Sequence, residues 1–110
     1  MTAGIKIEEL VATASVYAAQ GEVSTTEYYL SLAQRYAGKK DISAIVTDVE
    51  KRCFKKACRF NLSRAREFAR RGRIPVRDYC LSLAEEYARK IGTDISSQIA
   101  VIKATDYQKR

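Results

Sequence analysis

The sequence predicts an all-α protein of about five helices, built as two related helical hairpins joined through a long central helix. Three observations predict this fold. Apolar and small residues recur every three or four positions, as they do on the buried side of a helix. No segment shows the sustained alternation of polar and apolar residues that is typical of a strand. A stretch of the first half also returns in the second half with its apolar positions kept.

The expected helices cover residues 4–20, 24–37, 42–71, 75–91 and 95–108. Ser24 and Glu27 have the spacing of a capping box. Pro75 suits the first turn of its helix, where the missing N–H is not needed. Asp41 and Asp94 are expected to cap the helices that follow them. Four glycines fall just past the ends of helical stretches, where a residue that tolerates positive φ is needed: Gly21, Gly38, Gly72 and Gly92.

The third expected helix is long, about 45 Å at 1.5 Å per residue, and both halves of the chain share it. Its apolar stripe drifts near residues 53–58, so the sequence leaves open whether this helix is continuous or bent. Residues 14–37 align without gaps to residues 65–88, with ten of 24 positions identical. We therefore expect one helical domain over residues 1–110, with repeat units at about 4–53 and 54–108.

Each copy presents small, aromatic, glycine and aliphatic residues in the same order. The first copy has Ala14, Tyr17, Gly21, Val23, Leu30 and Ala33, and the second has Ala65, Phe68, Gly72, Ile74, Leu81 and Ala84. This pattern resembles the core of a tetratricopeptide repeat over about twenty residues of each copy. The resemblance implies a scaffold that binds a partner and catalyses no reaction.

The residue types present exclude many catalytic sites. The chain has no histidine, which excludes the Ser-His-Asp triad, the Cys-His dyad and zinc sites built on histidine. It has no Gly-rich phosphate loop and no nucleophile elbow. Cys53, Cys58 and Cys80 lack Cys-x-x-Cys spacing, so we interpret them as free thiols that act as small buried hydrophobes. We expect a non-enzymatic protein that binds no metal and no other cofactor.

The sequence also gives expectations about compartment. The N-terminus has no basic segment followed by an apolar stretch, so we expect no signal peptide. No apolar run approaches the ~20 residues that a membrane span needs. The apolar helix faces are rich in alanine and cysteine and have few bulky anchors for a lipid surface. We therefore expect a soluble, cytoplasmic protein with no membrane partner.

Positive charge is concentrated in the second half of the chain. Residues 1–50 carry four basic and seven acidic side chains, whereas residues 51–110 carry sixteen basic and six acidic ones. At six aligned positions, arginine stands in the second copy where the first has another residue: Thr13/Arg64, Ser15/Arg66, Ala19/Arg70, Gln20/Arg71, Glu22/Arg73 and Thr26/Arg77. The first copy is expected to fold without these arginines. Because like charges repel, a partner outside the hairpin should compensate them.

The spacing of the basic residues predicts a cationic ridge on one helix face, opposite the apolar stripe. Its members follow intervals of three, four and seven: Arg52, Lys56, Arg59, Arg66, Arg70 and Arg73. Such a ridge can contact successive phosphates and release condensed counterions. Guanidinium groups also suit bidentate phosphate contacts. The predicted nucleic-acid-binding residues are Arg52, Lys56, Arg59, Arg64, Arg66, Arg70, Arg71, Arg73 and Arg77.

Other interpretations of the ridge stay open. It can pair with the acidic first half, in the same chain or in a homodimer, where Glu8, Glu9, Glu22, Glu27, Asp41, Asp48 and Glu50 are available. It can also meet an acidic protein partner or be a plain solvated face. A DNA-reading helix-turn-helix around Gly72 is disfavoured because Arg77 and Asp78 occupy a region where the recognition helix needs an apolar residue. Contacts with DNA or RNA are therefore expected to be directed at the backbone, with little sequence preference.

Tyrosines are numerous and can in principle stack on unpaired bases. However, Tyr28 and Tyr36 have counterparts at Tyr79 and Tyr87, whatever the local charge. We therefore interpret these four residues as packing residues whose hydroxyl groups reach the surface.

Overall fold

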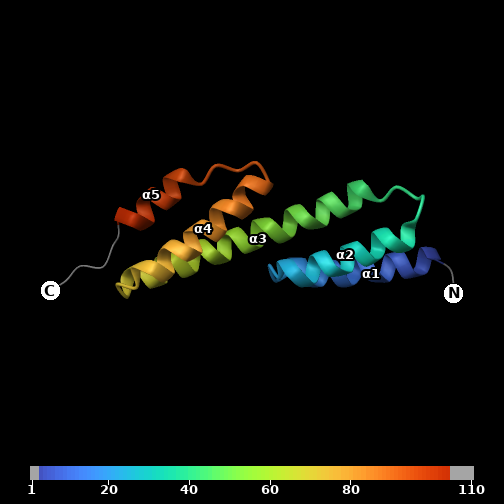
Figure 1. Cartoon of the computed structure of the whole chain (residues 1–110), viewed down its shortest axis with the longest axis horizontal. Coiled ribbons are helices and arrows are strands. Elements are labelled where there is room, and N and C mark those ends of the chain that lie inside the picture. Colours follow the sequence, from blue (N-terminus) through green and yellow to red (C-terminus); the bar gives the residue numbers. More distant parts are fainter. Residues whose placement is uncertain (1–2, 105–110) are drawn as a thin grey trace. The chain divides into compact units, whose positions relative to one another are not determined.

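A computed structural model of the chain describes residues 3–104, in which every regular element is an α-helix. The helices are α1 (Ala3–Ala19), α2 (Val23–Ala37), α3 (Ser43–Arg70), α4 (Ile74–Lys90) and α5 (Ser96–Ala104) (Figure 1). The predicted all-α class with about five helices is confirmed, and every helix boundary except the end of α5 lies within one residue of its predicted place. Residues 105–108, which the prediction gave to the last helix, lie outside the described residues.

The chain divides into two compact units, and the boundary between Lys56 and Ala57 falls inside α3. Unit 1 contains α1, α2 and the first half of α3, while unit 2 contains the second half of α3, α4 and α5. The α3 helix is continuous over 28 residues. The unit boundary lies close to the predicted repeat boundary after residue 53.

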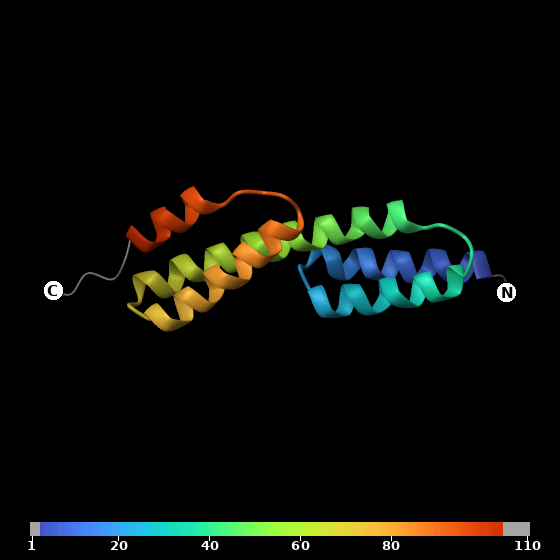
Figure 2. The same ribbon diagram turned by 45° about the horizontal axis from the view of Figure 1, so that its top comes forward.

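In unit 1, α1 and α2 lie side by side (Figures 1 and 2). Ala14, Ala18 and Ala33 are almost completely buried. Because their side chains are short, they allow the helices to approach closely. The unit 1 core is formed by Ile7, Leu10, Ala14, Ala18, Leu30, Ala33, Ile42, Val46, Val49 and Cys53.

In unit 2, α4 lies beside the second half of α3, and α5 follows after a loop (Figure 2). Alanines again occupy the most buried positions, as at Ala65, Ala69 and Ala84. The unit 2 core is formed by Cys58, Leu62, Ala65, Ala69, Cys80, Leu81, Ala84, Ala88, Ile95 and Ile102. Residues at aligned positions thus enter the core of each unit, while the duplication itself stays a prediction.

The turns after α1 and α3 are built alike. Gly21 and Gly72 both have φ of 74°, a left-handed conformation that glycine adopts without steric cost. The next amide donates a hydrogen bond back to the helix in each unit, from Glu22 to Tyr17 O (3.1 Å) and from Arg73 to Phe68 O (2.9 Å). These bonds satisfy carbonyl groups that the helix end would otherwise leave unpaired. The prediction that glycines follow the helix ends is confirmed at all four positions.

The helix starts only partly follow the sequence prediction. The capping box at Ser24 is wrong, because α2 already begins at Val23 and its N-cap residue, Glu22, makes no side-chain capping bond. The Glu22 carbonyl accepts the Thr26 N–H at 3.0 Å, which starts the helix one residue earlier than predicted. Pro75 does lie in the first turn of α4, as predicted.

Asp41 and Asp94 lie one residue before the N-cap positions, Ile42 and Ile95, whose carbonyls accept the first helical hydrogen bonds, but their side chains still bond the first helical N–H. One carboxylate oxygen of Asp41 accepts the Ser43 N–H, and one of Asp94 accepts the Ser96 N–H, each at 2.9 Å. Hydrogen bonds from the Ser43 side chain and backbone lower the pKa of Asp41. Bonds from the Ser96 backbone and side chain lower the pKa of Asp94. Both carboxylates are therefore ionised at neutral pH, the form that favours a helix N-terminus.

Candidate nucleic-acid interface

The main candidate is an arginine face on unit 2, which we define as Arg59, Arg66 and Arg70 on the second half of α3. All three side chains are exposed. At about 100° per residue, their spacing of seven and four positions places them within roughly 40° of one another around the helix axis. Ala65 and Ala69 of the same half helix are buried in the unit 2 core. The helix therefore separates its packing side from a continuous cationic side.

Few carboxylates compete for the arginine face. Among residues 3–104, Arg59 and Arg66 make no ion pair. Glu67 is shared, with one oxygen 3.2 Å from Arg70 Nη1 and the other 3.0 Å from Arg71 Nη2. All three of these paired side chains are largely exposed. Exposed pairs are worth about 0–1 kcal/mol, so they leave both guanidinium groups open to exchange their partner for a phosphate.

The arginine face borders apolar surface of α5. Arg66 and Arg70 line a small hollow of about 70 Å³ together with Val101 and Ile102. Ile102 is buried in the unit 2 core, whereas Val101 is exposed. The aliphatic stems of the two arginines can therefore cover apolar surface while their charged ends stay in water.

Six of the nine predicted site residues do not lie on this face, and Arg73 and Arg77 are two of them. Because α3 ends at Arg70, the spacing argument does not extend to Arg73, which is instead the exposed N-cap residue of α4. Arg77 is buried, with 5% of its surface exposed, and its Nε and Nη2 donate to Asp78 Oδ1 at 2.9 and 2.7 Å.

The prediction that Arg77 contacts a phosphate does not fit the structure, because its side chain is buried. The reason is that the position is interior in both units. The aligned residue of unit 1, Thr26, has 0% of its surface exposed. The Thr26 hydroxyl donates to the Glu22 carbonyl at 2.7 Å and accepts from the Cys53 thiol at 3.5 Å. Arg77 therefore belongs to the packing of unit 2.

The predicted residues Arg52 and Lys56 belong to unit 1 and are both exposed. Arg52 Nη2 lies 2.9 Å from Asp48 Oδ2, four residues earlier on α3. This pair joins two exposed side chains, so it also contributes little to stability.

Arg64 makes contacts that the sequence prediction missed. Its guanidinium carbon lies 5.4 Å from the ring centroids of both Phe60 and Phe68. Phe68 is partly buried against the unit 2 core, whereas Phe60 is 54% exposed. The sequence held a signal for Phe60, since it falls outside the apolar stripe of α3 and aligns with Glu9 of the first copy.

The interpretation of the tyrosines as packing residues is wrong for three of the four. Tyr28 and Tyr79 are 60% and 64% exposed, and Tyr36 is also exposed. On α4, the buried residues Cys80 and Leu81 follow Tyr79 directly, so the helix turns the tyrosine ring away from the core. Only the prediction for Tyr87 agrees with the structure, since this residue packs against the unit 2 core.

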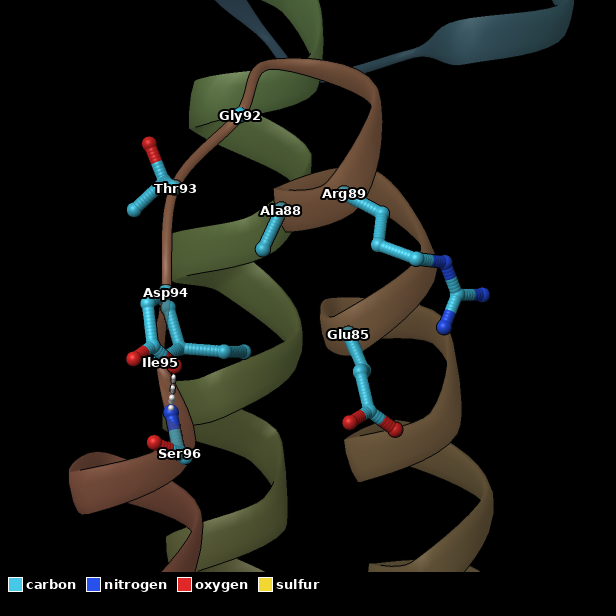
Figure 3. Close-up of a pocket in the computed structure, with 8 residues that line it drawn as sticks. All are labelled: Glu85, Ala88, Arg89, Gly92, Thr93, Asp94, Ile95 and Ser96. Carbon is cyan, nitrogen blue, oxygen red and sulfur yellow. Dashed lines mark hydrogen bonds between the residues drawn. The ribbon is translucent and has the colours of Figure 1, made fainter.

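A hollow of unit 2 does not gather groups for chemistry. It has a volume of about 340 Å³ and lies where α4 ends and the loop to α5 begins (Figure 3). Arg89 and Thr93 project to opposite sides, and Asp94 is engaged by the Ser96 N–H (Figure 3). Over the part of the chain that the structure describes, no three potential metal ligands lie together.

All three cysteines are buried, as predicted. Burial raises the pKa of the Cys53 thiol, and the hydrogen bond to Thr26 offsets this only in part. Burial also raises the pKa of Cys58. Since the thiolate is the reactive form, these two residues are suited to packing and not to nucleophilic chemistry.

Comparison with protein-family models, curated proteins and solved structures found no match. The tetratricopeptide resemblance therefore stays a prediction, and function has to be argued from the site. Among residues 3–104, none of the helices combines the length and apolar character required to cross a lipid bilayer.

Proposed function

We propose that the protein is a non-enzymatic module that binds the phosphate backbone of DNA or RNA through the arginine face, with little sequence preference. Arg59, Arg66 and Arg70 present planar donor groups along one exposed side of a helix. Such groups form short, charge-assisted hydrogen bonds to phosphate oxygens. Each contact also releases condensed counterions, which supplies most of the affinity of non-specific binding.

The observation that supports this proposal most strongly is the contrast with the aligned residues of unit 1. When the offset of 51 residues is extended along α1, Glu8, Ser15 and Ala19 stand where unit 2 has the arginine face, and Ser15 and Ala19 lie within the aligned stretch 14–37. The neighbouring core positions are alanines in both units, so packing does not explain the arginines. Concentrated like charge also tends to destabilise a compact state. A polyanionic partner accounts for side chains that the fold itself does not need.

Arg71 and Arg73 extend the proposed contact beyond the end of α3. Both are exposed and lie in or beside the turn between α3 and α4. Arg77 is not part of the proposed interface, because it is buried.

An acidic protein surface, including that of a second copy of the chain, is the second candidate partner. The observation in its favour is that Arg52, Arg70 and Arg71 already pair with carboxylates. Unit 1 supplies an exposed carboxylate at Glu8, beside a groove of about 360 Å³ with an apolar lining.

The proposal is tested by fluorescence anisotropy with labelled random-sequence oligonucleotides at low salt, about 50 mM. The wild-type chain is compared with the triple variant Arg66→Ser, Arg70→Ala, Arg73→Glu, which gives these positions the residues of the first copy and so removes the difference in charge there. Loss of three phosphate contacts is expected to weaken binding by roughly 100-fold or more. Circular dichroism is expected to show unchanged helicity, since the three positions are exposed.

A matched control removes the same charge from exposed positions of unit 1, with Arg35→Glu, Lys39→Ser and Lys40→Ala. This control is expected to weaken binding only slightly. The proposal fails if the wild-type chain binds no oligonucleotide at low salt. The second candidate is then supported if light scattering shows a dimer of the wild-type chain and a monomer of the first triple variant.

A further inference from the structure

Phe60 is an exposed aromatic residue beside the arginine face. It leaves 54% of its surface in water, although the same half helix buries Cys58, Leu62 and Ala65. Arg59 of the arginine face precedes it directly in the sequence. Neither the unit 2 core nor the residues packed against it include Phe60. The apolar core of the unit therefore does not account for a phenyl ring at this position.

The ring of Phe60 is held in place by a stack of side chains. The Arg64 guanidinium lies 5.4 Å from the Phe60 centroid and 5.4 Å from the Phe68 centroid. Phe68 is partly buried against the core, so it anchors the inner end of the stack. Cation–π contacts of this kind attract the guanidinium to the ring faces. Phe60, Arg64 and Phe68 thus form a row of alternating aromatic and cationic groups, with Phe60 at its exposed end.

Phe60 and the arginine face lie on neighbouring sides of α3. Around the helix axis, Phe60 is about 100° from Arg59, on the exposed side of α3. A strand whose phosphates follow the arginine face can turn its bases toward this ring. In a duplex, the bases already stack on one another and are paired, so their faces are not available. Proteins that bind single strands combine a cationic track with aromatic stacking platforms in this way.

Unit 1 lacks this combination at the aligned positions. Glu9 stands in the place of Phe60, and Thr13 stands in the place of Arg64. The residue aligned with Phe68 is Tyr17, which stacks on Tyr29 with ring centroids 5.9 Å apart. The exposed ring and the arginine face therefore occur together in unit 2.

We propose that the nucleic acid bound by unit 2 is single stranded, and that Phe60, held by Arg64 and Phe68, is the platform on which an unpaired base stacks. This inference rests on the proposed function, because the arginine face supplies the phosphate contacts. It adds a substrate class and a base-contacting residue.

The stacking contact can be read directly by fluorescence. The chain has no tryptophan, so Phe60→Trp introduces a single indole reporter. Stacking of a base on the indole is expected to quench its emission when a single-stranded oligonucleotide is added. A duplex of the same length is expected to leave the emission unchanged. The control is Tyr28→Trp, at a position of unit 1 with similar exposure, which neither probe is expected to quench.

The affinity measurement separates this inference from the proposed function. Phe60→Ala is expected to weaken single-strand binding roughly 5- to 100-fold, the range for one lost stacking contact, and to leave duplex binding unchanged. The stacking platform is refuted if Phe60→Ala changes the affinities for the single strand and for the duplex equally, or changes neither of them. It is also refuted if the emission of the introduced tryptophan is not quenched. The proposed function then still stands, provided that the arginine triple variant weakens binding of both probes. If the wild-type chain binds neither probe, both proposals fail.

Discussion

Where α1 of unit 1 presents Glu8, Ser15 and Ala19, the second half of α3 in unit 2 presents Arg59, Arg66 and Arg70. The interior does not change in the same way. Aligned small and aliphatic residues are buried in both units, among them Ala14 with Ala65, Ala18 with Ala69, Leu30 with Leu81 and Ala33 with Ala84. The comparison separates the buried residues, which both units share, from the exposed arginines of unit 2, to which we assign the proposed contact with a partner.

Arg77 shows how far this comparison can be taken. It differs from its aligned residue, Thr26, as sharply as the arginine face differs from α1, yet both positions are buried. A difference in charge between the units therefore points to a partner only where the side chain is exposed. Arg59, Arg66 and Arg70 meet this condition and Arg77 does not.

The largest effect on stability is expected at Arg77. Arg77→Ala removes a buried side chain and leaves a cavity, so unfolding should become easier by about 2–4 kcal/mol. Asp78 is half exposed, so water can hydrate the carboxylate that loses its partner. Arg66→Ser, at an exposed position, should change stability by no more than about 0.5 kcal/mol. Urea denaturation followed by circular dichroism measures both values.

The unit 1 counterpart sharpens this test. Thr26→Ala loses the hydroxyl bonds to Glu22 and Cys53 and should cost about 1 kcal/mol. Equal stability of Arg77→Ala and the wild type, together with a loss of nucleic-acid binding, would show that the Arg77 guanidinium reaches the partner, contrary to its burial.

The smallest effect on stability is expected when the aspartates before α3 and α5 are replaced, and the change in stability should be similar in the two units. The pKa values of Asp41 and Asp94 are lowered in the folded state, so their ionised forms stabilise it. That contribution is present above the pKa of the unfolded chain. It is lost as the pH falls below about 4, the pKa of an aspartate in the unfolded chain, and then through the lower pKa that the same aspartate has in the folded protein. Asp41→Ala and Asp94→Ala should each lower the Tm at pH 7.

The difference in Tm between each alanine variant and the wild type should close as the solution is acidified. The control is Asp94→Asn, whose side-chain oxygen can still accept the Ser96 N–H but does not titrate. A Tm difference that persists unchanged at pH 2.5 would contradict the role given to the carboxylate charge.

Sequence periodicity was sufficient for the fold because the apolar spacing, the glycines past the helix ends and the aspartates before α3 and α5 all indicate the same elements. The prediction of Arg77 as an exposed site residue failed because the charge of the side chain was given more weight than its position in the helical period. The spacing of four, three and four from Arg77 to Leu81, Ala84 and Ala88 places it on the buried side of α4.

The contact of Phe60 with Arg64 was harder to predict. The exposure of Phe60 depends on which side of α3 packs in unit 2. The three- and four-residue period of apolar residues is interrupted between Cys53 and Cys58, where α3 passes from the unit 1 core to the unit 2 core. The identity of a packing side is a tertiary property, which the spacing alone does not determine.

The central claim is that the arginine face of unit 2 neutralises nucleic-acid phosphates. Its most direct test is the slope of log binding constant against log salt concentration for a random-sequence probe. For the variant Arg66→Ser, Arg70→Ala, Arg73→Glu, the slope should be shallower than that of the wild type by about 3, one for each lost contact. The variant Arg35→Glu, Lys39→Ser, Lys40→Ala should keep the wild-type slope. Equal slopes for the wild type and the first variant would contradict the claim.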